Sequence, residues 1–333
     1  MINVRLIPSL KPKTSYIFLL IALLISNPVK LFSQDDTDTT FSQEYESKLI
    51  GRFYFSKKYT ALQFKSLDHQ PIRYLPSTTL NMGIGATYKF ATLNLAYGFG
   101  FLNPNREKKG NTRYLDLQAH MVLNKKFIVD FYGEFYRGFY SRIRYDEPYY
   151  LRKDLNVNVL GIDVLKILNH KNFDIQSPDQ SHSKQHFSGA SFLLGGEIIG
   201  GIISADSAII PSQIEESNQF SFEKISFYKI APSIGLGFKL IILKRLIFNG
   251  AISTGLAIGY TNLSLPSNEH LDFFYFRPDF NFRIYTGVMM GEWNVGMKFF
   301  NERTRFLTDK ENEFVNMDIG NLRLILSRRI NIK

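Results

Sequence analysis

Apolar and polar residues alternate along most of the chain with a period of two. Between residues 80 and 101 the apolar positions are Leu80, Met82, Ile84, Ala86 and Tyr88, followed by Leu93, Leu95, Tyr97, Phe99 and Phe101. A period of two places successive side chains on opposite faces of a β-strand. Each such strand has one oily and one wet face, and in a membrane a sheet of this kind must close so that no backbone edge faces lipid.

The same alternation recurs to the C-terminus and predicts about twelve strands. They span residues 49–65, 78–89, 91–101, 112–123, 126–141, 155–168, 187–203, 223–240, 244–261, 272–289, 291–306 and 315–331. Tight turns are expected at residues 90, 124–125, 241–243 and 290, whereas the connections between them are longer and rich in proline. This sorting of loop lengths is typical of outer-membrane barrels, whose short turns face the periplasm. We therefore predict an all-β fold, a single antiparallel transmembrane β-barrel of about twelve strands with short periplasmic turns, long extracellular loops and both termini at the short-turn end.

One stretch departs from the alternation. Residues 169–172 suit a short turn, but residues 173–185 are polar and rich in Asp and Ser. This segment could form an extra strand, a plug or a disordered insertion, and the strand count depends on which of these it is.

The N-terminus has the composition of a secretory signal. Basic residues precede a ten-residue apolar run at 16–25, and a polar stretch rich in Asp and Thr begins at Gln34. The apolar run is too short for a transmembrane helix, which needs about 20 apolar residues. We predict a cleaved signal peptide over residues 1–33, a polar leader over 34–47 and a barrel domain over 48–333, with the mature protein in the outer membrane.

Composition narrows the possible chemistry and partners. The chain has no cysteine, which excludes a lipid anchor, disulfides and thiolate chemistry. Hydrophobic residues make up 44% of the chain, which suits a barrel in which every second position is oily. Removing residues 1–33, with four basic residues and no acid, lowers the formal charge from +10 to +6. Since no basic stripe is interleaved with stacking aromatics, we expect no nucleic-acid binding.

The remaining basic excess indicates the membrane surface as a partner. Two predicted connections and the strand ends beside them carry Arg106, Lys108, Lys109 and Arg113, and Arg137, Arg142, Arg144, Arg152 and Lys153. Guanidinium and ammonium groups bind phosphate, so outer-membrane lipid with its anionic head groups is an expected partner. Solvated loop charge is the alternative, and the sequence identifies no protein partner.

Residues spread along most of the chain resemble a known family. They are Tyr74-Leu75-Pro76, Gly83, Gly85, Tyr88, Lys89, Gly110, Tyr114, Asp116, Gln118, Lys126, Asp130, Tyr136, Gly138, Tyr140, Ser188-Gly189-Ala190-Ser191 and Leu194-Gly195-Gly196. From about residue 45 onward this pattern resembles the Bacteroidota family catalogued as domain of unknown function 4421. The resemblance implies an exported outer-membrane barrel of undefined activity. Such a barrel would need the barrel-assembly machinery as a partner, although residues 330–333 lack the terminal aromatic of many assembly signals.

Metal-binding patterns are weak. His182 and His186 lie four residues apart in a polar segment that is not obviously helical. A zinc site needs three or four protein ligands, and nothing in the sequence fixes a third ligand here. We therefore expect neither a metal nor another cofactor.

Catalytic patterns are equally sparse. His120 and Asp116 share one face of a predicted strand, opposite a hairpin partner that carries Asp130 and Glu134. With a nearby serine, this group would resemble a hydrolase triad. Because no serine on either strand is placed to attack, a polar network inside the lumen is the favoured interpretation, and we predict no catalytic residue.

The face opposite the oily one defines the candidate lumen. The lumen-lining candidates are Asp116, His120, Asp130, Glu134, Tyr275, Arg277, Asp279, Arg283 and Arg323. A barrel of about twelve strands can hold a narrow pore or a plugged lumen, and arginines paired with acids would favour the plug. We expect a non-enzymatic narrow channel or a structural or partner-binding barrel. The alternatives are an outer-membrane lipid-modifying hydrolase and a soluble exported β-sandwich.

Overall fold

The computed structural model describes residues 42–44, 48–65, 71–88, 91–104, 106–142, 149–180, 183–185, 188–210, 222–267, 269–307 and 314–331. Within these ranges the chain is all β apart from two short 3-10 helices, η1 (Gly100–Leu102) and η2 (Glu107–Lys109). No helix in this part of the chain is long and apolar enough to cross a membrane. The predicted signal peptide, residues 1–33, lies outside the described residues, as do Phe90, His182 and His186.

Twelve of the fifteen strands follow the alternating segments of the sequence. The strands are β1 (Ser42–Glu44), β2 (Lys48–Lys65), β3 (Ile72–Tyr74), β4 (Leu80–Tyr88), β5 (Ala91–Tyr97), β6 (Arg113–Leu123), β7 (Phe127–Ser141), β8 (Tyr150–Ile167), β9 (Ser183–Gln185), β10 (Gly189–Ser204), β11 (Lys224–Ile242), β12 (Leu246–Ser264), β13 (His270–Met290), β14 (Trp293–Leu307) and β15 (Phe314–Asn331). The short strands β1, β3 and β9 had no counterpart in the predicted pattern because three residues are too few to show a period.

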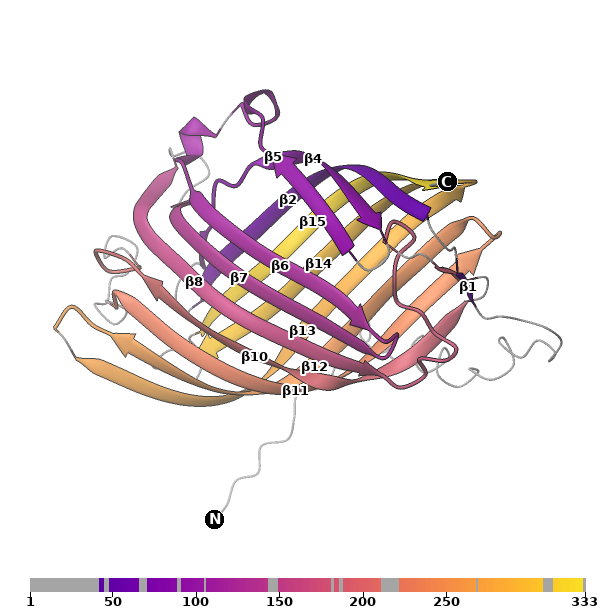
Figure 1. Ribbon diagram of the computed structural model, residues 1–333. Coiled ribbons are helices and arrows are strands. Elements are labelled where there is room, and N and C mark those ends of the chain that lie inside the picture. The colour runs from indigo at the N-terminus through magenta and orange to yellow at the C-terminus, as the bar shows by residue number, and fades with distance from the viewer. Residues whose placement is uncertain are drawn as a thin grey trace, which may run out of the picture. The chain divides into compact units, whose positions relative to one another are not determined.

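Twelve long strands form one antiparallel, strongly curved sheet (Figure 1). Its order is β5-β4-β2-β15-β14-β13-β12-β11-β10-β8-β7-β6, and β3 pairs with β2 beside this path. The first and last long strands, β2 and β15, pair along their whole length, from Asn331 opposite Lys48 to Phe314 opposite Lys65. The predicted class, strand number and antiparallel order are thus confirmed. The beginning of β2 and the end of β15 lie side by side at the short-turn end.

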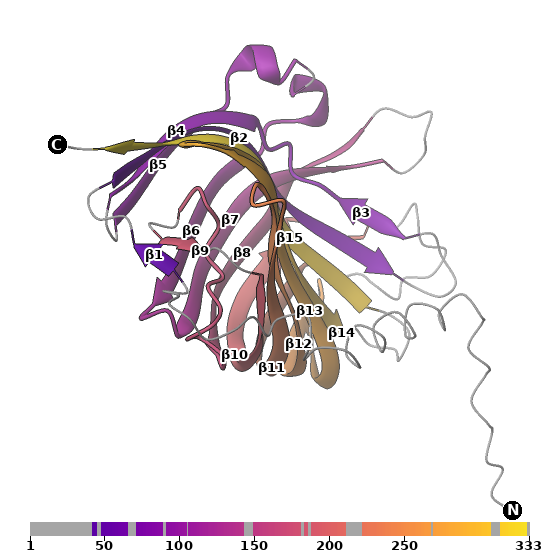
Figure 2. The ribbon, with the colours of Figure 1, turned by 90° about the vertical axis from the view of Figure 1, so that its right-hand side faces the viewer.

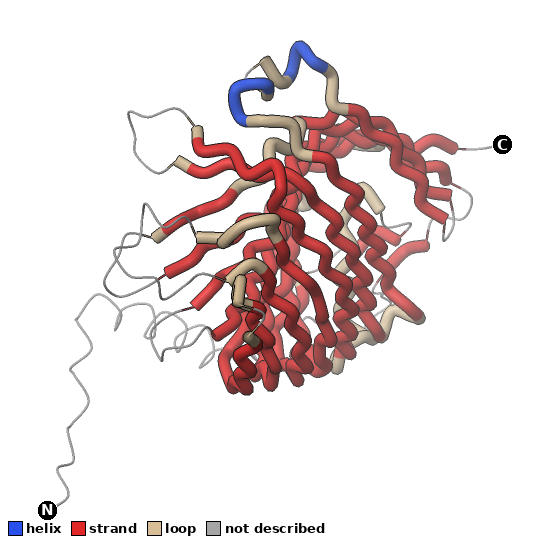
Figure 3. Tube along the Cα trace, turned by 90° about the vertical axis from the view of Figure 1, so that its left-hand side faces the viewer, coloured by secondary structure: helices blue, strands red, loops and turns tan. Residues whose placement is uncertain are grey.

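One seam of the curled sheet is not hydrogen-bonded. Strands β5 and β6 follow each other in the chain but do not pair within the described residues, so the ladder is open where a closed cylinder was expected. The alternation predicted a strand up to residue 101, but β5 ends at Tyr97. At Gly98 the backbone lies so close to Thr79 that a Cβ atom would stand 2.3 Å from its hydroxyl. After β5 the chain leaves the sheet and enters the connection that carries η1 and η2 (Figure 3).

Tight hairpins close the short-turn end of the sheet. Asn124 and Lys125 both have positive φ angles, and so do Leu243 and Lys244. Two consecutive residues with positive φ make a type I′ turn, whose twist matches that of the flanking strands. The second hairpin turns two residues later than the sequence predicted, because the apolar residues up to Ile242 continue the ladder of β11.

The two faces of the sheet differ in exposure and in chemistry. On the outward face large apolar side chains remain exposed, such as Ile84 at 63% and Ile234 at 62%. The inward face is buried and holds both the polar groups and a cluster of apolar side chains that includes Leu62, Phe227 and Phe306. The sheet curls back on itself (Figure 2), so this inward face forms the core.

Candidate functional site

The middle of the barrel holds a buried cluster of charged groups. Lys229 on β11 is 1% exposed, and its Nζ donates to Glu197 on β10 at 3.4 Å, to Asp279 on β13 and to the hydroxyl of Thr304 on β14 at 2.9 Å. A fully buried lysine is rare unless it is paired, because an isolated buried ammonium loses its hydration. The surrounding carboxylates supply that pairing.

Opposite walls of the barrel meet at this level. The hydroxyl of Tyr132 on β7 lies 2.7 Å from a carboxylate oxygen of Glu302 on β14 and within hydrogen-bond distance of Glu197. Around the sheet, β7 and β14 are separated by six strand positions on the side that runs through β10. Since the path has twelve strands, these two strands stand on opposite sides of the interior. The contact therefore spans the lumen.

A second charged group links these walls nearer the short-turn end of the barrel. Arg283 on β13 donates to Asp130 on β7 and lies 3.6 Å from Asp163 on β8. The Nδ1 atom of His120 on β6 lies 2.6 Å from Asp130. Three of the predicted lumen residues thus meet in one ion-paired cluster that includes Asp163, which the sequence had not singled out.

The other predicted lumen residues lie on the inward face without forming one site. Asp116 pairs with Lys58 and accepts a hydrogen bond from Tyr136 at 3.1 Å, while Glu134 accepts one from Thr60 at 2.9 Å. Asp279 belongs to the Lys229 cluster. The remaining three are the buried Tyr275, the half-buried Arg277 and Arg323, which lies 4.6 Å over the ring of Tyr54.

The His120 group has the geometry of a dyad but not of a triad. The imidazole side chain is 39% exposed, and Asp130 orients it through Nδ1. In the part of the chain that the structure describes, the side chains in hydrogen-bond contact with His120 are Asp130 and Arg283, and neither carries the hydroxyl that a serine triad needs. No group of three or more metal-ligating side chains occurs among the described residues. Asp130 and Arg283 hold the imidazole of His120 in position by hydrogen bonds.

The polar segment after β8 enters the short-turn end of the barrel. Phe173 is fully buried and Ile175 is 7% exposed, and both pack against inward residues of β7, β8, β10 and β12. The barrel wall also binds the backbone of this segment. Asn249 donates to the carbonyl of Ile175, Lys239 donates to that of Gln176 at 2.9 Å, and Arg329 donates to that of Pro178 at 3.3 Å. Residues 173–180 therefore form a plug, one of the three outcomes that the sequence had left open.

Asp179 fixes the tip of this plug to the wall. Lys298 on β14 donates to its carboxylate at 2.9 Å and to Gln180 at the same distance. Burial alone would raise the pKa of Asp179, but the Lys298 ammonium, together with Arg52 and Ser177, outweighs burial and leaves the pKa below its ordinary value. Beyond the plug, β9 pairs with β1, so the chain before the barrel and the chain after the plug join in a small two-stranded sheet (Figure 2).

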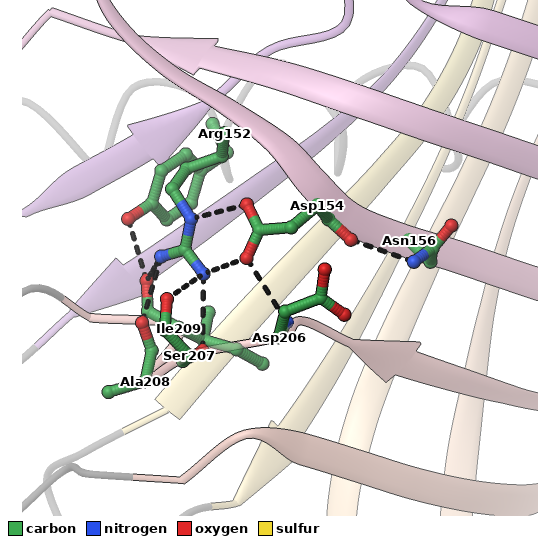
Figure 4. Close-up of polar contacts among 8 residues, drawn as sticks. Arg152, Asp154, Asn156, Asp206, Ser207, Ala208 and Ile209 are labelled. Atoms are coloured by element: carbon green, nitrogen blue, oxygen red, sulfur yellow. Dashed lines mark hydrogen bonds and ion pairs between the residues drawn. The ribbon is translucent and has the colours of Figure 1, made fainter.

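At the long-loop end another segment is held by a buried arginine. Arg152 on β8 binds Asp154 through two hydrogen bonds of 2.9 Å and donates to the carbonyls of Ser207, Ala208 and Ile209 (Figure 4). Tyr74 donates to the carbonyl of Ile209 at 2.7 Å. The sequence placed Arg152 in a connection facing lipid phosphates, which is wrong, because the side chain is 3% exposed and points inward.

Sequence reasoning missed the residues at the centre of the interior. Lys229 and Glu197 are the decisive omissions, together with Glu302. Lys229 stands between outward Tyr228 and Ile230, so alternation alone places it in the lumen. A single charged residue within an apolar strand was the available signal.

The comparisons with known proteins define a family. A family model described as Domain of unknown function (DUF4421) matches residues 36–326. The chain belongs to this family. No curated protein matches the sequence.

Similar solved structures share little sequence with this chain. The outer membrane protease OmpT from Escherichia coli is 8% identical, with 90% of this chain and 100% of that chain covered and a TM-score of 0.39. The toluene transporter TodX from Pseudomonas putida is 7% identical, with 93% of each chain covered and a TM-score of 0.22.

Proposed function

We propose that the protein is a plugged outer-membrane barrel that serves as a structural or partner-binding protein and not as an enzyme or an open channel. The contact between Tyr132 and Glu302 carries this proposal, because it joins opposite walls at the middle of the lumen. The plug at residues 173–180 fills the short-turn end of the barrel. Residues 207–209, whose carbonyls are bound by Arg152, fill the long-loop end.

The outer-membrane location is supported by the distribution of apolar side chains. Exposed apolar residues cover the outward faces of the long strands, while charged groups such as Lys229 and Glu302 are buried inside. This is the inverse of a soluble protein and is typical of a barrel surrounded by lipid. In this proposal the chain is exported through the cleaved signal peptide at residues 1–33, and the short turns face the periplasm.

The arrangement of cations distinguishes the plugged barrel from an anion channel. A channel would present unpaired cations along a wet path. Arg283 is paired with Asp130 and Asp163, and Lys229 is paired with Glu197 and Asp279. These two cations are neutralised by acids, so this part of the interior is better suited to holding the wall rigid, while the loops present a binding surface.

Conductance in a planar bilayer tests this function. The full chain, refolded in detergent micelles and reconstituted, should give no discrete conductance steps above the bare membrane. Flotation of the same sample with lipid vesicles would verify insertion. Reproducible single-channel steps from inserted wild-type protein would overturn the proposal in favour of the narrow channel, and a stable soluble monomer in detergent-free buffer would overturn the membrane location.

A further inference from the structure

Four basic side chains lie together on the outward face of the barrel, near the ends of the strands that carry the long loops. They are Lys65 on β2, Arg73 on β3, and Arg303 and Arg305 on β14, and we call them the outer basic patch. Strand pairing brings them into register, with Arg303 opposite Asp318, Arg305 opposite Asn316, Phe314 opposite Lys65 and Gln63 opposite Arg73.

An aromatic ring organises the centre of the outer basic patch. The guanidinium of Arg305 lies 4.2 Å from the ring centroid of Phe314, and the ammonium of Lys65 lies 5.9 Å from the same centroid. Cations over an aromatic face are attracted by its quadrupole, so the ring holds two like charges close together. Arg305 also donates from Nε to Asn316 at 3.1 Å, which fixes the plane of its guanidinium.

The positive charge of the patch is only partly neutralised. Arg303 forms a two-point ion pair with Asp318, with distances of 2.6 and 3.0 Å, and its side chain remains 50% exposed. Among the described residues Asp318 is the acid paired with the patch. Within the part of the chain that the structure describes, Lys65, Arg73 and Arg305 form no ion pair with an acid.

The patch begins where the apolar band of the wall ends. On β14 the outward residues are Trp293, Val295, Met297 and Phe299, followed by Asn301, Arg303 and Arg305. The ten residue-to-residue steps from Trp293 to Arg303 rise about 24 Å along the barrel axis, at about 3.4 Å per step and a tilt of about 45°. The lipid-facing band of such barrels is about 25 Å tall, which sets Trp293 at one membrane border and Arg303 at the other.

The strands that follow β14 in the sheet carry aromatic rings on their outward face toward the long loops. There Tyr228, Tyr260 and Phe274 form a row of neighbouring rings on β11, β12 and β13, with centroids 5.1 Å apart at each step. Such a row anchors a barrel at the interface without selecting a lipid. The outer basic patch does not extend into this row of rings.

We propose that the outer basic patch binds a phosphate group in the head group of a lipid in the outer leaflet. Arg73, Arg305 and Lys65 supply the charge, and arginine forks match the geometry of phosphate oxygens. The acyl chains of the same lipid would lie on the apolar stripe below, at Phe299 and Leu322. This inference rests on the proposed membrane location.

Lipid titration in micelles tests the patch. The full chain, folded in zwitterionic detergent, is titrated with diphosphorylated lipid A, with phosphatidylcholine and with inorganic phosphate, and bound lipid is counted by native mass spectrometry. The test variant is Lys65→Ala/Arg73→Ala/Arg305→Ala, which leaves the pair between Arg303 and Asp318 intact. The control Lys126→Ala/Lys166→Ala/Lys171→Ala removes the same charge from exposed positions at the short-turn end.

Wild type should prefer lipid A over phosphatidylcholine, and the test variant should bind lipid A about tenfold or more weakly, because charge-assisted hydrogen bonds are lost. The control should stay within about twofold of wild type. Three results would each overturn the lipid site while leaving a folded, micelle-embedded barrel. They are equal binding of both lipids, equal losses in both variants, and competition by inorganic phosphate at the same phosphate concentration. A stable soluble monomer in buffer would instead overturn the membrane location and the lipid site together.

Discussion

The inward and outward faces of strand β11 show opposite relations between charge and solvent. Lys229 points inward and is 1% exposed, whereas its neighbours Tyr228 and Ile230 point outward and are 59% and 57% exposed. In a soluble protein the lysine would be outside and the isoleucine inside. The difference shows that the outward face is built for an apolar surrounding, and that the inward polar face is stabilised by pairing and not by water.

The largest expected effect comes from removing the charge at the centre of the inward face. Lys229→Met leaves Glu197, Asp279 and Glu302 without their buried cation, and breaking a buried pair in this way lowers stability by about 3 to 5 kcal/mol. Urea unfolding of the refolded protein in micelles measures this loss. Lys224→Met, at the exposed end of the same strand, is the matched control and should change stability by less than about 0.5 kcal/mol. Similar losses in both variants would mean that Lys229 is not a buried partner.

A charge placed on the outward face should cost less and should depend on depth. Ile284→Arg lies near the middle of the proposed lipid band and should lower the folding free energy by about 2 to 4 kcal/mol. Phe274→Arg, at the loop end of the same strand and face, should cost about 0 to 1 kcal/mol. Folding titrations in lipid vesicles give both values. If the two substitutions cost the same, the outward face does not meet hydrocarbon.

Close packing of tyrosine on glycine inside the wall should give a smaller effect. Tyr132 lies opposite Gly161, where a Cβ atom would stand 2.1 Å from its ring. Gly161→Val must push the ring away from Glu302 and should lower stability by about 1 to 3 kcal/mol through overpacking. At Gly200 the nearest atom to an added Cβ lies 3.5 Å away, so Gly200→Val serves as the control and should be nearly neutral. Unfolding in micelles compares the two, and an equally stable Gly161→Val would show that the ring does not pack there.

The smallest expected effect is on the docking of the plug, which should weaken at acid pH. The pKa of Asp179 is held below its ordinary value, so its ion pair with Lys298 is present at neutral pH and is lost as the pH falls through that lowered pKa. A fluorophore on an Asn172→Cys variant, in a chain without other cysteines, reports whether residues 173–180 stay docked. Docking should be constant from pH 7 to about pH 5 and should weaken below about 4. In the same labelled chain, Asp179→Asn should remove the acid transition, weakening docking at pH 7 by about 1 to 2 kcal/mol. An unchanged transition would mean that another group controls the plug.

Alternation predicted the wall well because each strand carries its own signal. The twelve segments, the tight turn at Asn124 and Lys125 and the inward position of Asp130 all follow from the local period of two. The contacts that fill the interior do not follow from it. Tyr132 and Glu302 are 170 residues apart in sequence, and their contact depends on how the sheet curls. The plug shows no period in its sequence. Its position depends on wall side chains, such as Arg329, that bind its backbone.

The contact between Tyr132 and Glu302 is the most direct test of a filled interior. A double-mutant cycle compares Tyr132→Phe, Glu302→Gln and the combined variant by urea unfolding in micelles. If the hydroxyl and the carboxylate meet across the lumen, the two substitutions should be coupled by about 1 to 3 kcal/mol. If the walls stand apart around a wet pore, the two effects should add to within about 0.5 kcal/mol, and the plugged barrel would be contradicted.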